Sequence, residues 1–256
     1  MIAFVAGLAF SAEAENWPSW RGDVAGSGIV RGEKIPLEWG TKKNVRWRVP
    51  LPDRGNSSPI VWGDKVFITQ ATDSDKRRTV MCFDKHTGEL LWRTGVTYTK
   101  AEKTHKTNPY CSGSPATDGR VVVANYASAG VAAYDLEGQQ LWHRKLGPQE
   151  HIWGNGTSPV LFGDLCIVYH GPGPRSSLHA LDKLSGRTVW KRKVQEKDDP
   201  NRVDGFRGAN GGINGAFTTP IIIEVQGRHE LILSEANTLR ALSPEDGSEL
   251  WRCNGL

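Results

Sequence analysis

The sequence predicts an all-β fold, a β-propeller, on three observations. A short phrase with an internal Gly and a final Trp recurs along the 256 residues, first as DKHTGELLWR from Asp84 to Arg93. A Ser-Pro or Thr-Pro step and two apolar runs around a turn precede each copy. Trp47 and the four Trp residues of these phrases lie 45, 50, 48 and 61 residues apart. A four-stranded propeller blade takes about 40–50 residues, so the spacing indicates one blade per phrase.

The first fourteen residues are expected to be a secretory signal peptide. They hold the apolar run IAFVAGLAF and then AEA at Ala12–Ala14, a small-x-small cleavage pattern. The run is too short to cross a bilayer as a helix, and a buried first strand is the alternative. We therefore expect a periplasmic or secreted protein, with residues 15–39 as an N-terminal extension. No other run is apolar for long enough to span a membrane.

The composition argues against nucleic acid as a partner and against a zinc site. Lys and Arg number 32 against 28 Asp and Glu, a small surplus without a long basic cluster. The four Cys residues form no CxxC, and no Cys/His spacing suits zinc. Cys82 and Cys166 lie inside apolar runs, where we expect small buried side chains, although an oxidising compartment would permit disulfides.

Each predicted blade has four antiparallel strands. Gly63-Asp64, Asp118-Gly119 and Gly163-Asp164 are signals for a tight hairpin between the first two strands, and the fourth copy has the looser VQGRHE. A third strand follows, and the recurring phrase supplies the last turn and the fourth strand. A lone fourth strand, NVRWRVPL, is expected to precede the complete blades. We expect a partial propeller over 40–256, part of a ring of seven or eight blades, with blades at about 56–94, 112–144, 156–192 and 216–252.

The recurring Trp residues are predicted to wedge between neighbouring blades, each burying on the order of 200 Å². Stacking on a ligand is the alternative. The Asp before each turn is expected to accept hydrogen bonds from turn amides, and the Gly to supply a positive φ. The predicted docking positions are Trp47, Trp92, Trp142, Trp190 and Trp251, with Asp84, Asp135 and Asp182, and with Gly88, Gly138, Gly186 and Gly247.

The phrase ALDKLSGRTVW, from Ala180 to Trp190, resembles the tryptophan-docking motif of the pyrroloquinoline-quinone repeat propellers. CFDKHTGELLW matches from its Asp onward, YDLEGQQLW is one residue short, and LSPEDGSELW has Ser243 in place of Asp. The resemblance covers about residues 40–256 and implies a propeller of the quinoprotein-repeat type. The layout from NWPSWRG through HKTNPYCSGSP also resembles secreted propellers that are abundant in planctomycete-type bacteria.

The resemblance implies two kinds of function. Some members of the family are quinoprotein alcohol or glucose dehydrogenases, and others, such as the propeller lipoprotein of outer-membrane β-barrel assembly, bind proteins and carry no quinone. This chain has no adjacent Cys pair like that of the alcohol dehydrogenases, and no motif matches their Glu, Asn and Asp around calcium. Four complete blades are about half of an eight-bladed ring, so the chain is interpreted as part of a longer product and half a ring as a poor cofactor cup.

Candidate binding residues come from the loops that join one blade to the next, because such loops meet at one mouth of a propeller channel. A cup with stacking aromatics, hydrogen-bonding amides and a clamping Arg would suit an anion, a sugar or a peptide. Alternatively, these side chains only bridge blades and satisfy loop backbone. His105 and His151 could also ligate a metal, although they lie 46 residues apart without local spacing. The candidates are His105, Asn108, Tyr110, His151, Trp153, Asn155, Arg207 and Asn210.

The sequence predicts a non-catalytic binding scaffold for a protein or an extracellular polymer. GxSxG and HExxH are absent, and the Gly-rich GFRGANGGING lacks the Gly-Lys-Ser/Thr of a phosphate-binding loop. The alternative function is that of a quinone-dependent dehydrogenase fragment that oxidises alcohols or sugars, with pyrroloquinoline quinone and calcium as its cofactors. A hydrolase or lyase is a third hypothesis, which rests only on His105 and His151.

Overall fold

The computed structural model describes residues 16–30, 35–173, 175–194, 215–236 and 238–255. The described residues form four antiparallel four-stranded sheets, and their only helix is a 3-10 turn at Ala127–Ala129. This confirms the predicted all-β propeller architecture with four complete blades. The expected signal peptide lies outside the described residues. Among those residues, no helix is long and apolar enough to cross a membrane.

Each sheet takes its four strands in chain order, and we number the sheets 1 to 4. Sheets 1 and 2 consist of β1 (Ile60–Trp62), β2 (Lys65–Thr72), β3 (Arg77–Asp84), β4 (Leu90–Thr97), β5 (Ala116–Thr117), β6 (Val122–Asn125), β7 (Val131–Tyr134) and β8 (Gln140–Arg144). Sheets 3 and 4 consist of β9 (Val160–Phe162), β10 (Leu165–His170), β11 (Ser177–Asp182), β12 (Thr188–Lys193), β13 (Ile221–Val225), β14 (Arg228–Glu235), β15 (Thr238–Leu242) and β16 (Glu249–Asn254).

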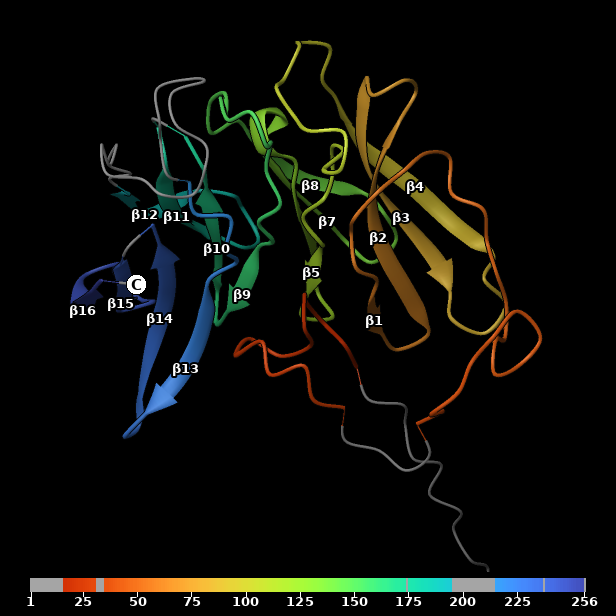
Figure 1. The fold of residues 1–256 in the computed structure, drawn as a ribbon, viewed down its shortest axis with the longest axis horizontal. Helices are drawn as coiled ribbons and strands as arrows, with labels where there is room; N and C mark the ends of the chain where they lie inside the picture. The colour runs from red at the N-terminus through yellow and green to blue at the C-terminus, as the bar shows by residue number, and fades with distance from the viewer. Residues whose placement is uncertain (1–15, 31–34, 174, 195–214, 237, 256) are drawn as a thin grey trace, which may run out of the picture.

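The sheets stand side by side, and their first strands lie nearest to one another (Figure 1). The hydrophobic core is divided into clusters between adjacent sheets, which we call seams 1–2, 2–3 and 3–4. Seam 1–2 buries Cys82 and Cys111, and seam 2–3 buries Cys166. All three thiols are free, as is the exposed Cys253. The expectation that Cys82 and Cys166 are small buried side chains is therefore confirmed.

Four indoles dock on the last turn of the sheet that follows them; three come from the preceding sheet, and Trp47 comes from the segment before sheet 1. Each ring lies over the turn Gly, where an added Cβ would come within 2.6–2.7 Å of ring atoms. The Gly also has a positive φ of 69–88°, so the position excludes a side chain both sterically and conformationally. The indole Nε1 donates to a turn carbonyl at 2.8–3.0 Å in every case. The sets of Trp, turn Gly and carbonyl residue are Trp47, Gly88 and Lys85; Trp92, Gly138 and Leu136; Trp142, Gly186 and Lys183; and Trp190, Gly247 and Pro244.

The Asp before each turn organises the platform on which the indole docks. Asp84 Oδ1 accepts hydrogen bonds from the amides of His86 and Thr87 at 2.8 and 2.7 Å. The hydrogen bonds from Thr87 hold the pKa of this carboxyl below its usual range. Asp182 accepts two turn amides in the same way, and Asp135 does so in its shorter turn.

The structure differs from the prediction around Trp47, and the docking of Trp251 stays a prediction because the described residues hold no sheet after sheet 4. Residues 45–50 belong to no strand, because a strand needs a ladder partner and this segment is held by its side chains instead. Trp47 and Val49 pack on the outer face of sheet 1 against a cluster that includes Met81. Trp251 is 38% exposed, and its indole donates to Glu230 Oε2 at 2.7 Å rather than to a turn carbonyl.

The Ser-Pro and Thr-Pro steps link the inner ends of the four sheets. The amide of Ser58 donates to Ser114 Oγ, that of Ser114 to Ser158 Oγ, and that of Ser158 to Thr219 Oγ1, each at 2.9 Å. Each hydroxyl thus satisfies a backbone amide of the preceding sheet, just before the Pro that opens its own first strand. This belt of hydroxyls fixes the height of each sheet relative to the next.

Residues 16–28, which we call the strap, run along the inner edges of the sheets. The strap lies at one end of the molecule, below β1 and β5 in Figure 1. Its backbone bonds to sheets 1, 2 and 4, so it covers parts of strand edges that would otherwise be free to pair. The pairs, each with hydrogen bonds of 2.8 Å, are Trp17 with Val61, Pro18 with Thr117, and Val24 with Ile222.

Candidate functional site

The candidate site lies at the end of the molecule opposite the strap. The loops at 98–115 and 145–159, which leave β4 and β8, both lie at this end in Figure 1. The sequence placed Arg207 and Asn210 in the loop after β12, and both fall outside the described residues. Six of the eight candidate residues can therefore be placed.

The first two loops are fastened to each other by an amide and a ring pair. Asn108 Nδ2 donates to the carbonyl oxygens of Trp153 and Asn155 at 2.6 and 3.3 Å. The His105 ring packs on Trp153, with centroids 4.5 Å apart and planes 57° apart. Four of the candidates are thus brought together, although the hydrogen-bonded residues lie 45 and 47 positions apart in the chain.

His151 extends this aromatic row toward sheet 4. Its ring meets Phe217 edge-on, with centroids 5.2 Å apart and planes 79° apart. Phe217 is 42% exposed. Sequence reasoning missed Phe217, because it stands in the apolar AFTTP stretch that opens a strand. Only its position two residues before the Thr-Pro step could have indicated that Phe217 lies close to the loops.

Tyr110 positions the first loop through its hydroxyl and its ring. Its hydroxyl donates to the Glu102 carbonyl oxygen at 2.6 Å, and the guanidinium of Arg78 lies 3.9 Å from its ring centroid. Burial raises the pKa of the Tyr110 hydroxyl. A neutral phenol that covers a cation and caps a carbonyl is a packing element of this loop.

Arg78 is the anchor of that loop, and sequence reasoning missed it. The residue is only 1% exposed, and its Nη2 lies 3.5 Å from Glu102 Oε2. Glu102 in turn accepts the amide of Ser128 at 3.0 Å, which ties the loop to sheet 2. In the sequence Arg78 is the last residue of KRR, and a run of three basic residues usually indicates a solvent-exposed segment. Alternate side chains of a strand point to opposite faces of its sheet, so only a strand assignment would predict that one of the three is buried.

Asn155 also uses its amide within the fold. Its Nδ2 donates to Thr157 Oγ1 at 3.2 Å and to the carbonyl of Gly171. For Asn108, Tyr110 and Asn155 the structure therefore favours the bridging role that we considered as the alternative. The two ring pairs remain, and we call this set of four rings the rim: His105 with Trp153, and His151 with Phe217.

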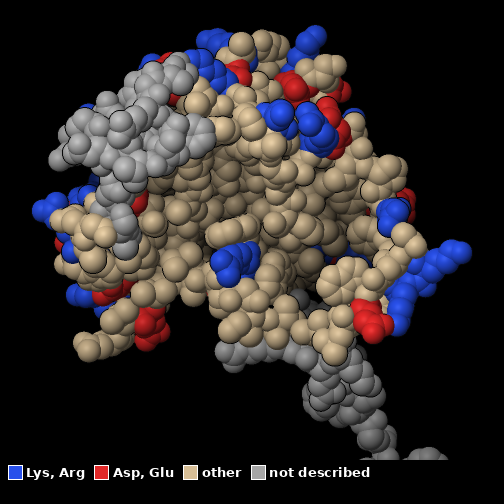
Figure 2. Space-filling model, in the orientation of Figure 1, with Lys and Arg blue, Asp and Glu red and all other residues tan. Residues whose placement is uncertain are grey.

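Charged side chains border the broad face of the molecule that Figure 2 shows. Figure 2 shows that Lys, Arg, Asp and Glu gather mainly around the edge of this face, whereas its middle is mostly uncharged apart from one basic patch near the centre. The pocket beside β5 and β9 is lined by Trp20 and Val24 of the strap, so it lies at the strap end and not at the rim. Arg54, Lys103 and Lys106 are exposed, and Arg54 Nη1 donates to the Lys106 carbonyl at 3.3 Å beside the first loop. The arrangement suits stacking and van der Waals contact at the rim and weak attraction of anions by these exposed basic side chains.

The described residues do not supply a metal centre. No three His, Cys, Asp or Glu side chains among them are placed to hold an ion. His105 and His151 stack on different aromatic partners rather than on each other.

Together, the docked indoles, the turn platforms and the radial order of the sheets define a β-propeller of the tryptophan-docking kind. The chain belongs to the pyrroloquinoline-quinone repeat family. The family model described as "Outer membrane protein assembly factor BamB" matches residues 37–170 and 174–254.

Curated relatives of two kinds resemble the chain. A polyvinylalcohol dehydrogenase of Pseudomonas sp. is 21% identical over 197 residues, which cover 72% of this chain and 30% of the relative. The outer membrane protein assembly factor BamB of Alkalilimnicola ehrlichii is 24% identical over 200 residues, which cover 78% of this chain and 43% of the relative. The chain thus spans less than half the length of these relatives.

Solved structures show the same fold. A quinohemoprotein alcohol dehydrogenase from Pseudomonas putida HK5 superposes with a TM-score of 0.62 at 16% identity, over 98% of this chain and 42% of that one. BamB from Moraxella catarrhalis superposes with a TM-score of 0.54 at 19% identity, over 84% of this chain and 56% of that one.

Proposed function

We propose that this chain belongs to a periplasmic or secreted binding scaffold that holds a protein or an extracellular polymer at its rim. The observation that carries the proposal is the rim itself: aromatic rings from successive loops pack in pairs at one end of the propeller. The side-chain amides of Asn108 and Asn155 bond to the loops, so the loops that carry the rings are held in place. A preorganised aromatic surface favours large ligands that gain affinity by contact area.

The printed names of two kinds of relative support a large partner. One is named as an assembly factor of outer membrane proteins, and the other as a dehydrogenase of polyvinyl alcohol, which is a polymer. Both names refer to macromolecules. An expected signal peptide at residues 1–14 agrees with a location outside the cytoplasm, where either kind of partner occurs.

Direct binding measurements with two probes test the proposal. Polyvinyl alcohol, cast into native gels, represents a polymer, and a urea-unfolded outer-membrane β-barrel polypeptide represents a protein. We expect at least one probe to retard or bind the protein, and Trp153→Ala with Phe217→Ala to weaken that binding roughly tenfold or more. Leu184→Ala is the matched control, because Leu184 is 45% exposed but lies in the β11–β12 turn, at the other end of the sheet. Equal binding by all three proteins would contradict the rim as the site.

A quinone-dependent dehydrogenase is the second candidate, and its support is the likeness to a polyvinylalcohol dehydrogenase. The fit of the described residues to the cofactor is poor. They hold no metal-ligand group, and no two of the four Cys residues are adjacent in the sequence. We therefore derive no step through a quinone. Titration with pyrroloquinoline quinone and calcium separates the candidates, since dye-linked oxidation of alcohols or sugars would overturn the scaffold proposal.

A further inference from the structure

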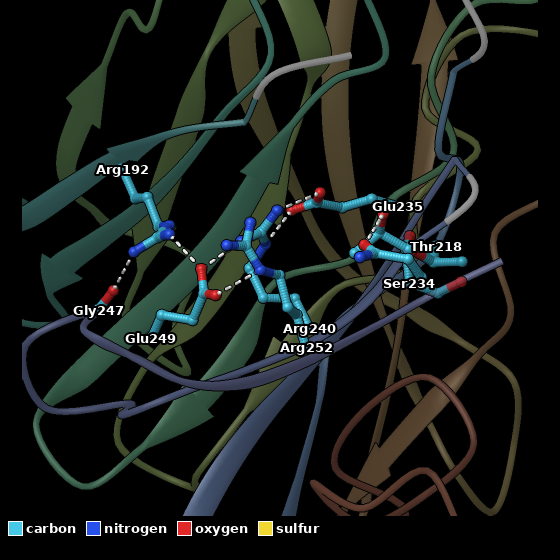
Figure 3. Close-up of polar contacts among 10 residues, drawn as sticks. Arg192, Thr218, Ser234, Glu235, Arg240, Gly247, Glu249 and Arg252 are labelled. Carbon is cyan, nitrogen blue, oxygen red and sulfur yellow. Dashed lines mark hydrogen bonds and ion pairs between the residues drawn. The ribbon is translucent and has the colours of Figure 1, made fainter. Parts of the chain in front are cut away.

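Seam 3–4 is held by a compensated network of charges (Figure 3). Arg240 makes two hydrogen bonds to Glu235, at 2.9 and 3.0 Å, and a third to Glu249. Arg192 reaches across from sheet 3 to Glu249 at 2.8 Å, and Arg252 Nε lies 3.4 Å from the same carboxylate. Three cations therefore share two carboxylates at this seam.

Strand register identifies the same five positions in sheet 3 and seam 2–3. Arg240 pairs with Arg252, and His179 pairs with Lys191 at the matching ladder position. The strand ladders also give the equivalents of Glu235 and Glu249. The equivalent of Arg192, which stands two residues after the docked Trp190, is the residue two positions after the docked Trp142. The equivalent pairs are Arg240 with His179, Arg252 with Lys191, Glu235 with His170, Glu249 with Thr188, and Arg192 with Arg144.

Seam 2–3 therefore lacks both carboxylates but keeps two cations. His170 and Thr188 replace the two Glu residues, whereas Arg144 and Lys191 remain at the exposed edge. The third cation is replaced by a second imidazole, His179. The two rings are 2% and 4% exposed, and their centroids are 6.2 Å apart.

The His pair has few polar partners. Ser177 Oγ lies 2.9 Å from His179 Nε2, while neither ring nitrogen of His170 makes a hydrogen bond of good geometry among the described residues. His170 borders a small open cavity together with the buried side chain of Gln149, whose Oε1 is also without a hydrogen-bond partner.

The other charged groups around the pair do not supply a free carboxylate. Glu150 and Arg175 border the same cavity, but they form an exposed ion pair with each other at 3.2 Å. His143, next to Arg144 on β8, directs Nε2 to the Ala129 carbonyl at 2.6 Å within its own sheet.

We propose that seam 2–3 is the acid-sensitive joint of this propeller. When His170 and His179 gain protons, two new cations stand beside Arg144 and Lys191 with no carboxylate at the positions that Glu235 and Glu249 occupy in seam 3–4. The buried cations repel each other and draw in water, so sheets 2 and 3 separate here before the other seams loosen.

The direction of the pH dependence follows from burial. Burial lowers the pKa of both imidazoles from 6.5 to about 4. A lowered pKa means that the closed seam has its full stability above about pH 6.5 and loses it as the pH falls toward 4. If the open seam restores ordinary values, each imidazole raises the opening constant by roughly tenfold or more between pH 7 and pH 5.

The four free thiols provide a reporter in the unmodified protein. Cys166 is buried in seam 2–3, Cys82 and Cys111 are buried in seam 1–2, and Cys253 is exposed. We would label the native protein with a dipyridyl disulfide from pH 7 to pH 4.5 and quantify each thiol by mass spectrometry. Dividing each rate by that of Cys253 removes the dependence of the reagent on pH.

We expect the relative labelling of Cys166 to rise at least about tenfold by pH 5, while Cys82 and Cys111 stay flat. In seam 1–2 the position of His170 holds Tyr126, which hydrogen bonds to Tyr134 at 3.2 Å and gains no proton in acid. A flat Cys166, or three buried thiols that rise together, would overturn the proposal.

Two variants locate the effect at the His pair. The triple change His170→Glu, His179→Arg and Thr188→Glu installs the side chains of seam 3–4, and we expect it to abolish the rise at Cys166. His170→Gln with His179→Gln removes both titrating groups without adding charge and should also flatten the profile. A folded variant of either kind that kept the wild-type rise in Cys166 labelling would show that His170 and His179 do not cause it.

Discussion

At the scale of single residues, the turn Gly has two roles that the structure separates. Gly138 has a φ of 88°, and a Cβ there would lie 2.7 Å from the ring of Trp92. Gly227 has a similar φ of 78°, but no atom lies within 4 Å of its Cβ position. The two positions therefore share the conformational cost of a side chain and differ in the steric cost.

We expect Gly138→Ala to lower the free energy of unfolding by about 2–4 kcal/mol, because strain and overlap with the indole add. Gly227→Ala should lower it by only about 1–2 kcal/mol, from strain alone. Urea unfolding of both variants measures the difference. Equal losses of unfolding free energy in the two variants would mean that the indole of Trp92 moves aside at little energetic cost. The close contact between the indole and the turn Gly would then not stabilise the seam.

Some of these residue roles could be predicted from the sequence and others could not. The Trp, Asp and Gly of the recurring phrase point to docking because their spacing repeats. The role of the Gly as the surface under the indole could not be foreseen, because the ring comes from a different sheet. The same holds for Ser114 and Ser158, whose Pro neighbours mark strand starts but whose hydroxyl partners lie across a seam.

At the scale of elements, the loop at 98–115 depends on one buried ion pair. Arg78→Ala would leave Glu102 charged and buried beside Ser128, at a cost of about 3–5 kcal/mol. We expect faster hydrogen exchange in residues 98–113 and weaker binding at the rim. The double variant Arg78→Met with Glu102→Gln keeps the volume without the charges and should recover most of the stability. If the single and double variants were equally unstable, the charge argument would fail.

The strap is the second element with a separable role. Removal of residues 16–28 should uncover the edges of β1, β5 and β13, because their backbone partners are Trp17, Pro18 and Val24. Free strand edges pair with other chains, so we expect concentration-dependent association by analytical ultracentrifugation. The control is Trp39→Ala, which changes a 75% exposed indole outside the strap. A deletion variant that stayed as monodisperse as this control would show that the strap protects no edge.

At the scale of the whole molecule, the repeat pattern predicts the four sheets but not how the seams differ. Every seam contains a docked Trp, and the regular spacing of these Trp residues allowed the fold to be predicted from the sequence. The charges that distinguish seam 2–3 from seam 3–4 stand at equivalent ladder positions, and such equivalence becomes visible only once strand register is known. The candidate loops were likewise predictable, whereas Phe217 and Arg78 were not, because their partners lie in other elements.

The rim is the feature on which the functional account depends, and site-specific photocross-linking tests it most directly. A photoreactive phenylalanine analogue would be placed at Trp153, at Phe217 and, as a control, at Leu184 in the protein expressed in its own cells. We expect discrete adducts with the same macromolecule from positions 153 and 217 and none from position 184. Adducts from the control position alone, or none from either rim position, would contradict a recognition surface at this end of the propeller.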